Sequence, residues 1–436
     1  MKPRPALPAG PYLVVGLARS GAAAVEMLRV HGEVMGCDSG SPPEAGALEG
    51  VEVELRSDGL GLLERAHTVV KSPGVPQRAP VIAAARARGV EVVGELEVAW
   101  RLVPNEVVAV TGTNGKTTTT ELIAAIHRAA GIEVAVAGNV GTPLATAAGR
   151  LARGAVVACE CSSFQLEDCS AFAPECAVLL NLEEDHLDRH GTLAAYREAK
   201  RSIFARQGAG DVAVAPPALA PEGPALAVSF GAPGADVALR DGLLIWRGEP
   251  LLEARELRLR GAHNLENAMA AAAATLARGV EPAAVRAALR TFAGVPHRLE
   301  QVGERDGVLY VNDSKATNVA SARRGLEAFE GGVHAILGGS LKGGGFEGLR
   351  SAVASRCRAA YLIGEAALRL ERDLDGAAPL HACGDLDRAL AAASEAARAG
   401  DVVLLSPACA SFDQYRDFER RGEHFRTLVA ALQRHE

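Results

Sequence analysis

The sequence has no apolar run that approaches the roughly 20 residues needed to cross a membrane. Its net charge is −7, so it offers no basic surface for nucleic acid or for an anionic membrane. None of the eight cysteines stands in a C-x-x-C pair, which argues against a zinc site. We therefore expect reduced, mostly buried cysteines in a cytoplasmic protein that binds neither nucleic acid nor membrane.

Lysine is also scarce, since only six of the 46 basic residues are lysine. Lys116, Lys315 and Lys342 each stand in a turn rich in Gly, Ser or Asn. Lys200 lies in a helical pattern directly beside arginines. A compact ammonium group can do chemistry that a planar guanidinium cannot. Chance retention explains one such lysine better than four, so these positions are candidates for function.

The most informative segment is a strand, a glycine-rich turn and a helix pattern. The apolar run Val107–Val110 leads into Thr111–Thr118, with the sequence T-G-T-N-G-K-T-T. Val110 stands where the usual phosphate loop G-x-x-x-x-G-K-[ST] has its first glycine, so this is a shorter form. We predict that the turn binds a nucleoside triphosphate, with Lys116 on the phosphates and Thr117 on Mg²⁺. The alternative is a glycine turn without a ligand.

Strands and helices alternate in three blocks, which predicts an α/β fold with three domains. Residues 1–105 indicate a Rossmann-like domain, and residues 106–296 a central P-loop ATPase-type domain with a mixed sheet. Residues 297–436 indicate a second Rossmann-like domain that ends in a helix near 415–433. Its strands are predicted at Val308–Val311, Ala335–Leu337, Ala359–Ile363 and Val402–Leu405.

The first block has its own glycine turn, Gly16–Gly21, between a predicted strand and a helix. Asp38 ends the next strand, as in a dinucleotide-binding fingerprint, but Ala18 breaks the G-x-G-x-x-G spacing. A nucleotide-diphosphate sugar would suit this turn as well as NAD would. Lys71–Gly74 forms a second turn at the same edge of the sheet.

Acidic residues and a histidine follow two strands of the second block. Glu160 comes after Val156–Cys159, and Glu184–His186 comes after Val178–Leu182. Ligands bind at these strand ends in open parallel sheets. Carboxylate and imidazole groups can hold Mg²⁺ when phosphate oxygens complete its shell. We expect a metal here, and a solvated acidic loop is the alternative.

Eight motifs occur in order along essentially the whole chain: Gly112–Thr118, Glu160–Leu166, Asn181–His186, Lys200, Gly261–Asn267, His297–Arg298, Asn312–Asn318 and Ser406–Ser411. Together they resemble the Mur ligases, ATP-dependent enzymes that add amino acids to peptidoglycan precursors. S-S-F-Q-L-E, N-D-S-K-A-T-N and S-P-A-C-A-S-x-D-Q are similar to the member that adds D-glutamate to UDP-N-acetylmuramoyl-L-alanine. Folylpolyglutamate synthases share the phosphate loop but are not expected to have these three motifs.

The resemblance implies three sets of binding residues. ATP would be bound by Gly112, Thr113, Asn114, Gly115, Lys116, Thr117, Thr118, Asn264, Asn267, Arg298 and Asp313. The UDP substrate would be bound by Gly16, Leu17, Ala18, Arg19, Ser20, Asp38, Ser39, Ser72, Pro73 and Asn139. D-Glutamate would be bound by Lys315, Thr317, Lys342, Ser411 and Phe418.

The resemblance also implies the reacting groups. The catalytic residues would be Lys116, Glu160, His186, Lys200 and Lys315. Two Mg²⁺ ions, one replaceable by Mn²⁺, would be held by Thr117, Glu160, His186 and a carbamylated Lys200. Carbamylation needs an amine that can lose its proton, which independently explains a lysine at position 200.

One departure from the family pattern follows the second strand. Asp38-Ser39 is followed by Gly40, where the resemblance leads us to expect arginine. Arg19 is the candidate to replace it. We also expect the third domain to close over the second, with hinges at Asn105 and within 294–297, so that water is excluded.

Several alternatives stay open at this stage. The chain could be another Mur-type or folylpolyglutamate-type amino-acid ligase, a regulatory P-loop ATPase, or an NAD-dependent oxidoreductase built on the first block. We expect a monomer whose partners are UDP-N-acetylmuramoyl-L-alanine, D-glutamate and ATP.

Overall fold

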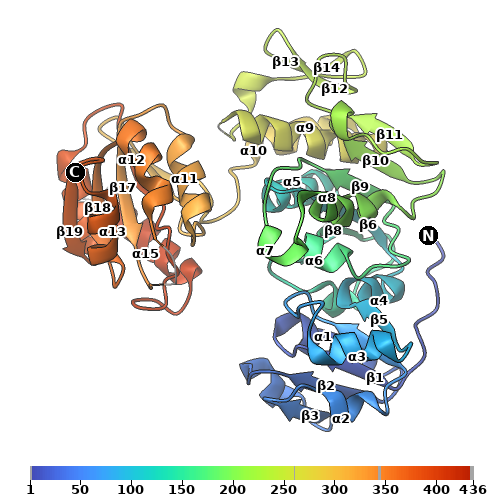
Figure 1. The fold of residues 1–436 in the computed structure, drawn as a ribbon. Coiled ribbons are helices and arrows are strands. Elements are labelled where there is room, and N and C mark those ends of the chain that lie inside the picture. Colours follow the sequence, from blue (N-terminus) through green and yellow to red (C-terminus); the bar gives the residue numbers. More distant parts are fainter. Residues whose placement is uncertain (1, 260, 342–344, 433–436) are drawn as a thin grey trace. The chain divides into compact units, whose positions relative to one another are not determined.

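The structure is a computed structural model that describes residues 2–259, 261–341 and 345–432. The chain divides into two compact units, Met1–Phe292 and Ala293–Glu436. Figure 1 shows the chain coloured from blue at the N-terminus to red at the C-terminus. Within the described ranges, no helix combines the length and the apolar character needed to cross a membrane.

The first sheet has five parallel strands in the order β3-β2-β1-β4-β5. The strands are β1 (Tyr12–Val15), β2 (Val34–Asp38), β3 (Glu52–Leu55), β4 (Thr68–Lys71) and β5 (Glu91–Gly94). The helices are α1 (Arg19–Leu28), α2 (Leu60–Leu63), α3 (Pro80–Ala87) and α4 (Glu95–Leu102), with a 3-10 turn η1 (Pro43–Ala47). All four residues of β1 are buried, as expected for a central parallel strand covered on both faces. The turns after β1, β2 and β4 meet at one edge.

The second sheet has six parallel strands in the order β11-β10-β9-β6-β8-β7. The strands are β6 (Glu106–Thr111), β7 (Val134–Gly138), β8 (Val156–Glu160), β9 (Cys176–Leu179), β10 (Val212–Ala215) and β11 (Leu226–Ser229). The helices are α5 (Lys116–Ala129), α6 (Ser163–Leu166), α7 (Leu187–His190), α8 (Leu193–Arg201), α9 (Ala262–Ala277) and α10 (Pro282–Thr291), and the 3-10 turns are η2 (Leu144–Ala147), η3 (Ser202–Phe204), η4 (Pro217–Leu219) and η5 (Ala254–Glu256).

Three antiparallel strands form a separate small sheet beyond α9 (Figure 1). They are β12 (Val237–Arg240), β13 (Leu243–Trp246) and β14 (Glu249–Glu253). Parallel and antiparallel strands therefore occur in two sheets of this region rather than within one. Seven consecutive residues of α9, 268–274, are almost completely buried, and six of them are alanines. Small side chains allow α9 to lie close to its neighbours.

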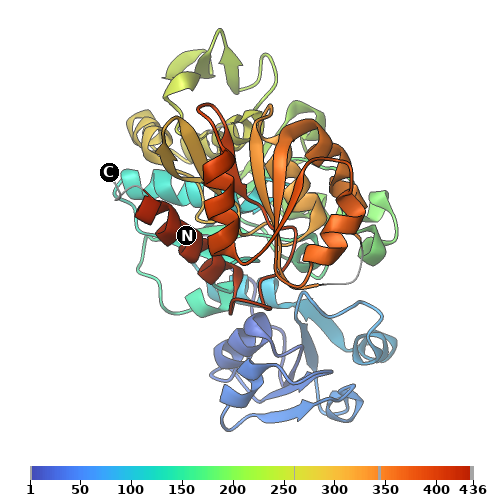
Figure 2. The ribbon, with the colours of Figure 1, turned by 90° about the vertical axis from the view of Figure 1, so that its left-hand side faces the viewer.

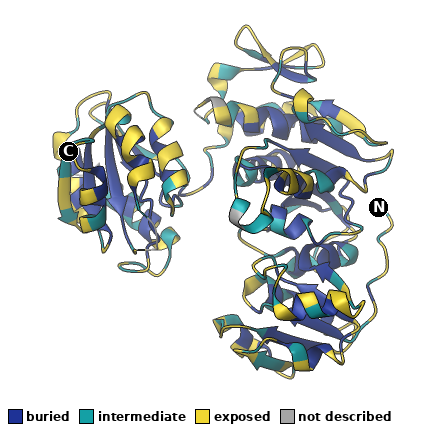
Figure 3. Cartoon of the chain, in the orientation of Figure 1, coloured by how far each residue is buried: buried dark blue, intermediate teal, exposed yellow. Residues whose placement is uncertain are grey.

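The first and second sheets share one hydrophobic core. Trp100 on α4 meets Phe172 with ring centroids 5.6 Å apart, and Val107 of β6 belongs to the same cluster. Figure 3 shows buried residues in both sheets, and one hydrophobic cluster includes residues of each. Asn105 at the junction donates to the carbonyl oxygens of Ala152 and Ala155, both at 2.9 Å. A junction held in this way does not fit the hinge that we expected at Asn105.

An N-terminal segment, residues 2–10, runs from the first sheet to the second. Arg4 donates to the carbonyl oxygens of Val103 and Asn105, and its guanidinium lies 4.5 Å from the centre of the Trp100 ring. Arg4 also pairs with Glu175 at 2.8 Å. Further along the segment, the carbonyl oxygen of residue 9 accepts a hydrogen bond from a threonine of β4. The segment therefore fastens the two sheets to each other.

The second unit contains a six-stranded sheet in the order β15-β16-β20-β17-β18-β19. The strands are β15 (Glu300–Arg305), β16 (Val308–Asn312), β17 (Val333–Gly338), β18 (Cys357–Ile363), β19 (Leu380–Gly384) and β20 (Val402–Leu405). The helices are α11 (Val319–Glu327), α12 (Arg350–Arg356), α13 (Ala367–Leu374), α14 (Leu386–Ala396) and α15 (Phe418–Leu432), with a 3-10 turn η6 (Glu347–Leu349). Only β15 is antiparallel to its neighbour.

Two cores flank this sheet. Helices α11, α12 and α13 cover one face of the sheet, and α14 and α15 cover the other (Figure 2). Their apolar side chains form the two cores. The final helix begins at Phe418 rather than near Tyr415. The preceding residues form a turn, in which N of Tyr415 donates to O of Ser411 at 2.7 Å.

Candidate active site

The glycine-rich turn after β6 has the backbone form that a phosphate-binding loop requires. Gly115 has φ +81° and directly precedes α5. A side chain there would strain the backbone, and its Cβ would lie 2.1 Å from Oδ1 of Asn267. Only glycine fits this position. A glycine turn directly before a helix N-terminus is the arrangement that binds phosphate groups.

Two lysines meet at one carbonyl oxygen of this turn. Nζ of Lys116 donates to the oxygens of Gly112 and Thr113, both at 2.9 Å. Nζ of Lys200, on α8, donates to the same Gly112 oxygen at 2.8 Å. Lys200 is only 2% exposed. Its burial, together with the charge of Lys116, lowers the pKa of Lys200 to about 7. A large share of the amine is therefore neutral at physiological pH.

Tyr196 is a partner of Lys200 that the sequence analysis missed. Its ring lies 4.8 Å from Nζ of Lys200, and its hydroxyl is 2.9 Å from Oγ1 of Thr113. Tyr196 stands one helical turn before Lys200 on α8, so the i, i+4 spacing was a usable signal. The tyrosine fixes Lys200 against the phosphate loop.

Thr117, Glu160 and Asn139 form a second group at the same strand ends. Oγ1 of Thr117 donates to Oε2 of Glu160 at 2.7 Å, and Nδ2 of Asn139 donates to Oε1 at 3.0 Å. Glu160 ends β8 and is 2% exposed. The structure thus brings together two predicted metal ligands and one predicted substrate residue.

His186 lies in a more open position. It has φ +50°, precedes α7, and its side chain is 48% exposed. Its ring centroid is 4.9 Å from that of Phe164. Among the described residues, no hydrogen bond or ion pair joins His186 to Thr117 or Glu160. The backbone does place it after β9, at the same edge of the sheet.

The donor set fits a metal only if further oxygen ligands are added. In the described part of the chain, no group of three His, Cys, Asp or Glu side chains could hold a metal ion. Glu160 and His186 are the two such residues in the predicted set. Mg²⁺ prefers oxygen ligands and commonly binds through one or two carboxylates plus phosphates. The hydroxyl of Thr117, a carbamate on Lys200 and the phosphates of ATP would supply the rest.

The loop after β9 holds the phosphate loop in place. Oδ1 of Asn181 accepts from N of Asn114 at 2.8 Å, and O of Asn181 accepts from N of Thr113 at 3.1 Å. Glu183 accepts from Nδ2 of Asn114 at 2.7 Å. The motif that contains Asn181 was recognised in the sequence, but this supporting role was not. It depends on contacts across about 70 residues, as the Asn181–Asn114 pair does with a separation of 67.

The turns of the first sheet form a second candidate site. Gly16 has φ +86°, and its carbonyl oxygen accepts from Oγ of Ser72 at 2.6 Å. The carboxylate of Asp38 accepts from N of Leu17 and from N of Gly40, both at 2.7 Å. The predicted residues Gly16, Leu17, Asp38 and Ser72 are therefore joined. The Leu17 side chain is fully buried, so this residue offers only backbone to a ligand.

A buried ion pair connects these turns to the second sheet. Lys71, the last residue of β4, is paired with Asp168 at 2.5 Å, and both side chains are almost inaccessible. Lys71 also lies 3.7 Å from Glu167, which pairs with Arg189 at 2.6 Å. Arg189 donates in turn to O of Val75 at 3.0 Å. The sequence analysis placed Lys71 in a turn at the ligand edge of the sheet. In the structure, its charge is instead paired with the buried carboxylate of Asp168.

Glu95, at the start of α4, is a buried acid beside this pair. Oε1 of Glu95 accepts from Nε2 of Gln165 at 3.0 Å, and Oε2 has no hydrogen-bond partner in the described structure. Burial raises the pKa of Glu95 to about 7, and Gln165 and Lys71 only partly oppose this.

In the second unit, Asp313 follows β16 and is 5% exposed. Its carboxylate accepts from Oγ of Ser406 at 2.7 Å and from N of Leu299 at 3.2 Å. Burial raises the pKa of Asp313 to about 7, and the charge of Arg298 opposes this weakly. Asp313 and Arg298, both predicted ATP residues, are thus close enough to interact.

The predicted D-glutamate residues lie after β16 and β20. N of Lys315 donates to O of His297 at 3.0 Å, and N of Thr317 donates to O of Lys315 at 2.9 Å. Ser411 is 2% exposed. Phe418 begins α15 and faces the His297 ring at 6.2 Å. Lys342 lies outside the described residues.

Of four further predicted residues, two lie near the phosphate loop and two are exposed. Asn267 is buried behind the phosphate loop, where Oδ1 accepts from Oγ1 of Thr119 at 3.3 Å, and its amide donates to Asn264. Ala18 and Arg19 are exposed at the start of α1, which keeps Arg19 available for a ligand. The ATP contacts of Asn264 and Asn267 stay a prediction.

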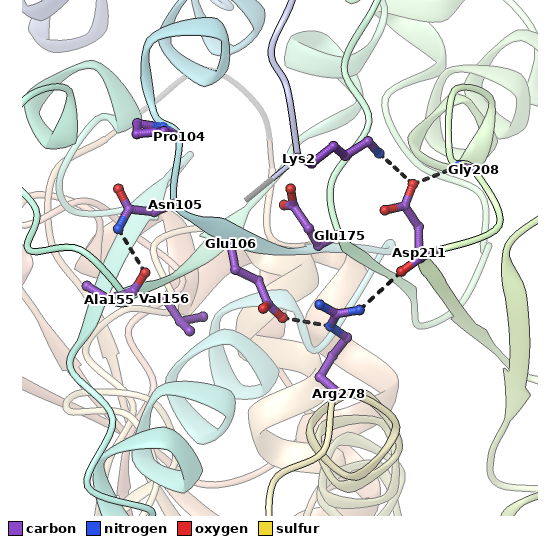
Figure 4. A pocket seen from close by; sticks show the side chains of 12 residues that line it. Lys2, Pro104, Asn105, Glu106, Ala155, Val156, Glu175, Gly208, Asp211 and Arg278 are labelled. Carbon is purple, nitrogen blue, oxygen red and sulfur yellow. Dashed lines mark hydrogen bonds and ion pairs between the residues drawn. The ribbon is translucent and has the colours of Figure 1, made fainter.

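A cavity of about 480 Å³ lies at the opposite ends of the second-sheet strands (Figure 4). Glu106 and Val156, which begin β6 and β8, line it. Its charged side chains are already paired, Glu106 with Arg278 and Asp211 with Lys2. Because ligand sites in parallel sheets lie at the carboxyl ends of strands, we place the active site at the phosphate loop and not here.

Three protein-family models match the chain. The Mur ligase MurD-like N-terminal domain matches residues 11–94, and the Mur ligase middle domain matches residues 110–224. The Mur ligase glutamate ligase domain matches residues 297–409.

Curated relatives match over almost the whole length. The UDP-N-acetylmuramoylalanine–D-glutamate ligase of Acidobacterium capsulatum is 42% identical, covering 96% of both chains. The ligases of the same name from Salinibacter ruber and Myxococcus xanthus are also 42% identical, and each covers 96% of this chain.

Solved structures share the fold at lower identity. UDP-N-acetylmuramate-alanine ligase MurC of Thermotoga maritima is 20% identical with a TM-score of 0.59, covering 98% of this chain and 99% of its own. The MurF ligase of the same organism, in complex with ADP, has a TM-score of 0.54 at 20% identity, covering 85% and 91%.

Proposed function

The chain belongs to the Mur ligase family, and on this premise we propose that it is an ATP-dependent, ADP-forming ligase that joins D-glutamate to UDP-N-acetylmuramoyl-L-alanine. The observation that carries this is the agreement of relatives 42% identical over 96% of this chain, which share one activity in their names. The reaction is a step of peptidoglycan precursor synthesis. We place it in the cytoplasm, in a monomeric protein.

The chemistry begins at the phosphate loop. The L-alanyl carboxylate attacks the γ-phosphorus of ATP, which gives an acyl phosphate and ADP. The amine of D-glutamate then attacks the acyl carbon, the amide bond forms, and inorganic phosphate leaves. Lys116, now held by two backbone oxygens, would turn to the phosphates and spread the charge that develops during transfer.

Mg²⁺ fits the groups around Glu160, and we assign Thr117, Glu160, His186 and a carbamylated Lys200 to two ions, one of which Mn²⁺ could replace. When bound, the metal neutralises phosphate charge and orients the transferring group. The contact between Thr117 and Glu160 supports this set.

Carbamylation of Lys200 is supported by its surroundings. The amine is buried against Gly112, and no carboxylate of the described residues pairs with it. In its neutral form the nitrogen attacks CO₂, a C–N bond forms and a proton leaves. The product is an anion, which relieves the crowding of two cations, Lys116 and Lys200, at one carbonyl oxygen.

We assign the three ligands to three regions. Residues 1–105 would bind the UDP substrate at Gly16–Ser20, Asp38, Ser39, Ser72 and Pro73, assisted by Asn139. Residues 106–296 would bind ATP, assisted by Arg298 and Asp313. Residues 297–436 would bind D-glutamate at Lys315, Thr317, Lys342, Ser411 and Phe418. The joined Gly16, Asp38 and Ser72 support the first assignment.

The test is phosphate release measured with each substrate omitted in turn. We expect release only when UDP-N-acetylmuramoyl-L-alanine, D-glutamate and ATP are all present. A regulatory ATPase would release phosphate without the other two. Another Mur-type or folylpolyglutamate-type ligase would respond to a different amino acid or acceptor.

A further inference from the structure

Arg421 is an almost completely buried arginine on α15, with 1% of its surface exposed. Its guanidinium uses all three nitrogens. Nε donates to Oγ of Ser314 at 3.0 Å, and Nη2 donates to O of Ser314 at 3.0 Å and to O of Cys409 at 3.1 Å. Nη1 donates to O of Ala410 at 3.3 Å and to O of Gly338 at 3.4 Å.

These acceptors belong to three turns at one edge of the sheet. Ser314 follows β16, Gly338 ends β17, and Cys409 and Ala410 follow β20. The three strands are neighbours in the order β16-β20-β17. One side chain therefore ties together three turns that are distant in sequence, with separations of 107, 83 and 12 residues from Arg421.

The backbone around Arg421 is shaped to receive it. At Gly339, a Cβ would lie 3.0 Å from Nη1 of Arg421 and 2.2 Å from O of Ala410. Oγ of Ser314 donates in turn to O of Phe418, at the start of the helix that carries Arg421, at 2.8 Å. Ser314 is thus bonded both to the Arg421 side chain and to the backbone at the start of the helix that carries it.

Arg421 has no direct ion-pair partner among the described residues, although the charge of Asp413 favours its protonated form from a distance. Every acceptor named above is an uncharged oxygen, and no carboxylate of the described residues forms an ion pair with it. Arg426, on the same helix, pairs with both Glu300 and Glu423. Although burial lowers the pKa of Arg421 to about 10, the group stays protonated at neutral pH. A buried cation that makes no direct ion pair is costly, so its five hydrogen bonds to uncharged oxygens call for an explanation.

The same turns carry the residues assigned to the amino acid. Lys315 and Thr317 follow Ser314, and Ser411 follows Ala410. We propose that Arg421 is a positioning residue for the amino-acid substrate, which holds these turns in one geometry and adds a fixed positive charge to the edge where an anionic amino acid binds. This inference rests on the proposed function.

The test compares Arg421→Lys and Arg421→Met with Arg420→Met. Arg420 is the preceding, exposed residue of α15 and serves as a control for helix propensity and net charge. KM is measured for D-glutamate, ATP and UDP-N-acetylmuramoyl-L-alanine, together with kcat. We expect Arg421→Met to raise the KM for D-glutamate about 100-fold and Arg421→Lys about tenfold, since the lysine keeps the charge but loses the fork. The other two KM values and the control should change less than about twofold.

A second measurement separates charge from shape. D-Glutamine, which lacks the side-chain charge, is used as a competitor of D-glutamate, and its Ki is compared with the KM of D-glutamate. We expect the preference for the acid to fall in Arg421→Met and to persist in Arg421→Lys. An unchanged KM for D-glutamate in Arg421→Met, or equal weakening of all three substrates, would overturn the inference.

The two proposals fail in different ways. If the wild-type protein releases no phosphate in response to D-glutamate, the proposed function is wrong whatever the variants do. If the wild type responds and Arg421→Met responds equally well, the function stands and the role of Arg421 is wrong. Should Arg421→Met not fold, Arg421→Lys carries the test, with its thermal midpoint compared with that of Arg420→Met.

Discussion

Lys200 shows how one side chain can be defined by what surrounds it. It is buried beside a second lysine, donates to a backbone oxygen and has a pKa lowered to about 7. A solvated lysine would have none of these properties, and an arginine could not supply a neutral amine. Substitutions of Lys200 therefore test the proposed metal site directly.

Lys200→Arg should abolish ligase activity although the positive charge is kept, because no carbamate can form. Lys200→Ala should be inactive as well, and millimolar acetate or formate should restore part of the activity by filling the gap with a carboxylate. The measurement is phosphate release with all substrates present. Arg197→Lys, on the exposed face of α8, is the control and should leave kcat unchanged. Near wild-type turnover in Lys200→Arg would rule out the carbamate.

Asp38 tests the first sheet as the site of the UDP substrate. Its carboxylate holds the backbone at Leu17 and Gly40, so Asp38→Ala loosens both turns. We expect the KM for UDP-N-acetylmuramoyl-L-alanine to rise about tenfold or more, with the KM for D-glutamate nearly unchanged. Asp58→Ala, a nearby acid on the next turn, is the matched control. Fluorescence titration should detect no NADH binding, and tight NADH binding would contradict the assignment.

At the level of helices and strands, the central strands of the second unit's sheet could be predicted and its two edge strands could not. β16, β17, β18 and β20 are apolar runs, and each appears where the sequence indicated. β15 and β19 are edge strands without a continuous apolar run, as Glu300–Arg305 illustrates. Only their pairing with a neighbouring strand defines them. Periodicity detects burial, and edge strands are not buried on both sides.

The candidate site divides in the same way. Gly112–Thr118 and Glu160 could be found because each follows an apolar run and is recognisable from consecutive residues. Asn181 and Arg421 could not be assigned their roles, because their partners lie far away in sequence. The role of Lys71 was missed for the same reason: its partner Asp168 is 97 residues away, so the sequence did not show the ion pair.

The start of α4 gives a prediction about pH. Glu95 has a pKa raised to about 7, so the folded protein binds its proton more tightly than the unfolded chain does. The contribution of this proton to the free energy of unfolding is fully present below about pH 4.5, the ordinary pKa of the group, and it is lost as the pH rises towards about 7. Glu95→Gln cannot ionise at this position and should not show this loss. Between these pH values, its free energy of unfolding should therefore rise relative to that of the wild type by at most about 3 kcal/mol.

The measurement is urea unfolding of both proteins at pH 5, 6, 7 and 8. Taking the difference between them cancels the other groups that titrate in this range. The neighbours that face Glu95 are Gln165 of α6 and Lys71 of β4. A difference that does not depend on pH would contradict the raised pKa.

For the molecule as a whole, the shared core predicts how the chain can be divided. Residues 1–292 should fold when expressed alone and unfold in urea in one transition, because Trp100, Val107 and Phe172 belong to one cluster. Residues 1–105 alone should not fold, since they would expose that core. Circular dichroism and tryptophan fluorescence should give the same midpoint for 1–292. Two separate transitions would show that the sheets are independent.

The fastening of residues 2–10 has a consequence for the order in which the chain can fold during its synthesis. Lys2 pairs with Asp211 across 209 residues, and Arg4 contacts Glu175 across 171. The strands of the first sheet are complete long before either partner has been made. The Arg4–Glu175 pair can therefore form only after the chain has been synthesised to Glu175, and the Lys2–Asp211 pair only after Asp211. Until then these two cations lack their carboxylate partners and stay accessible to chaperones.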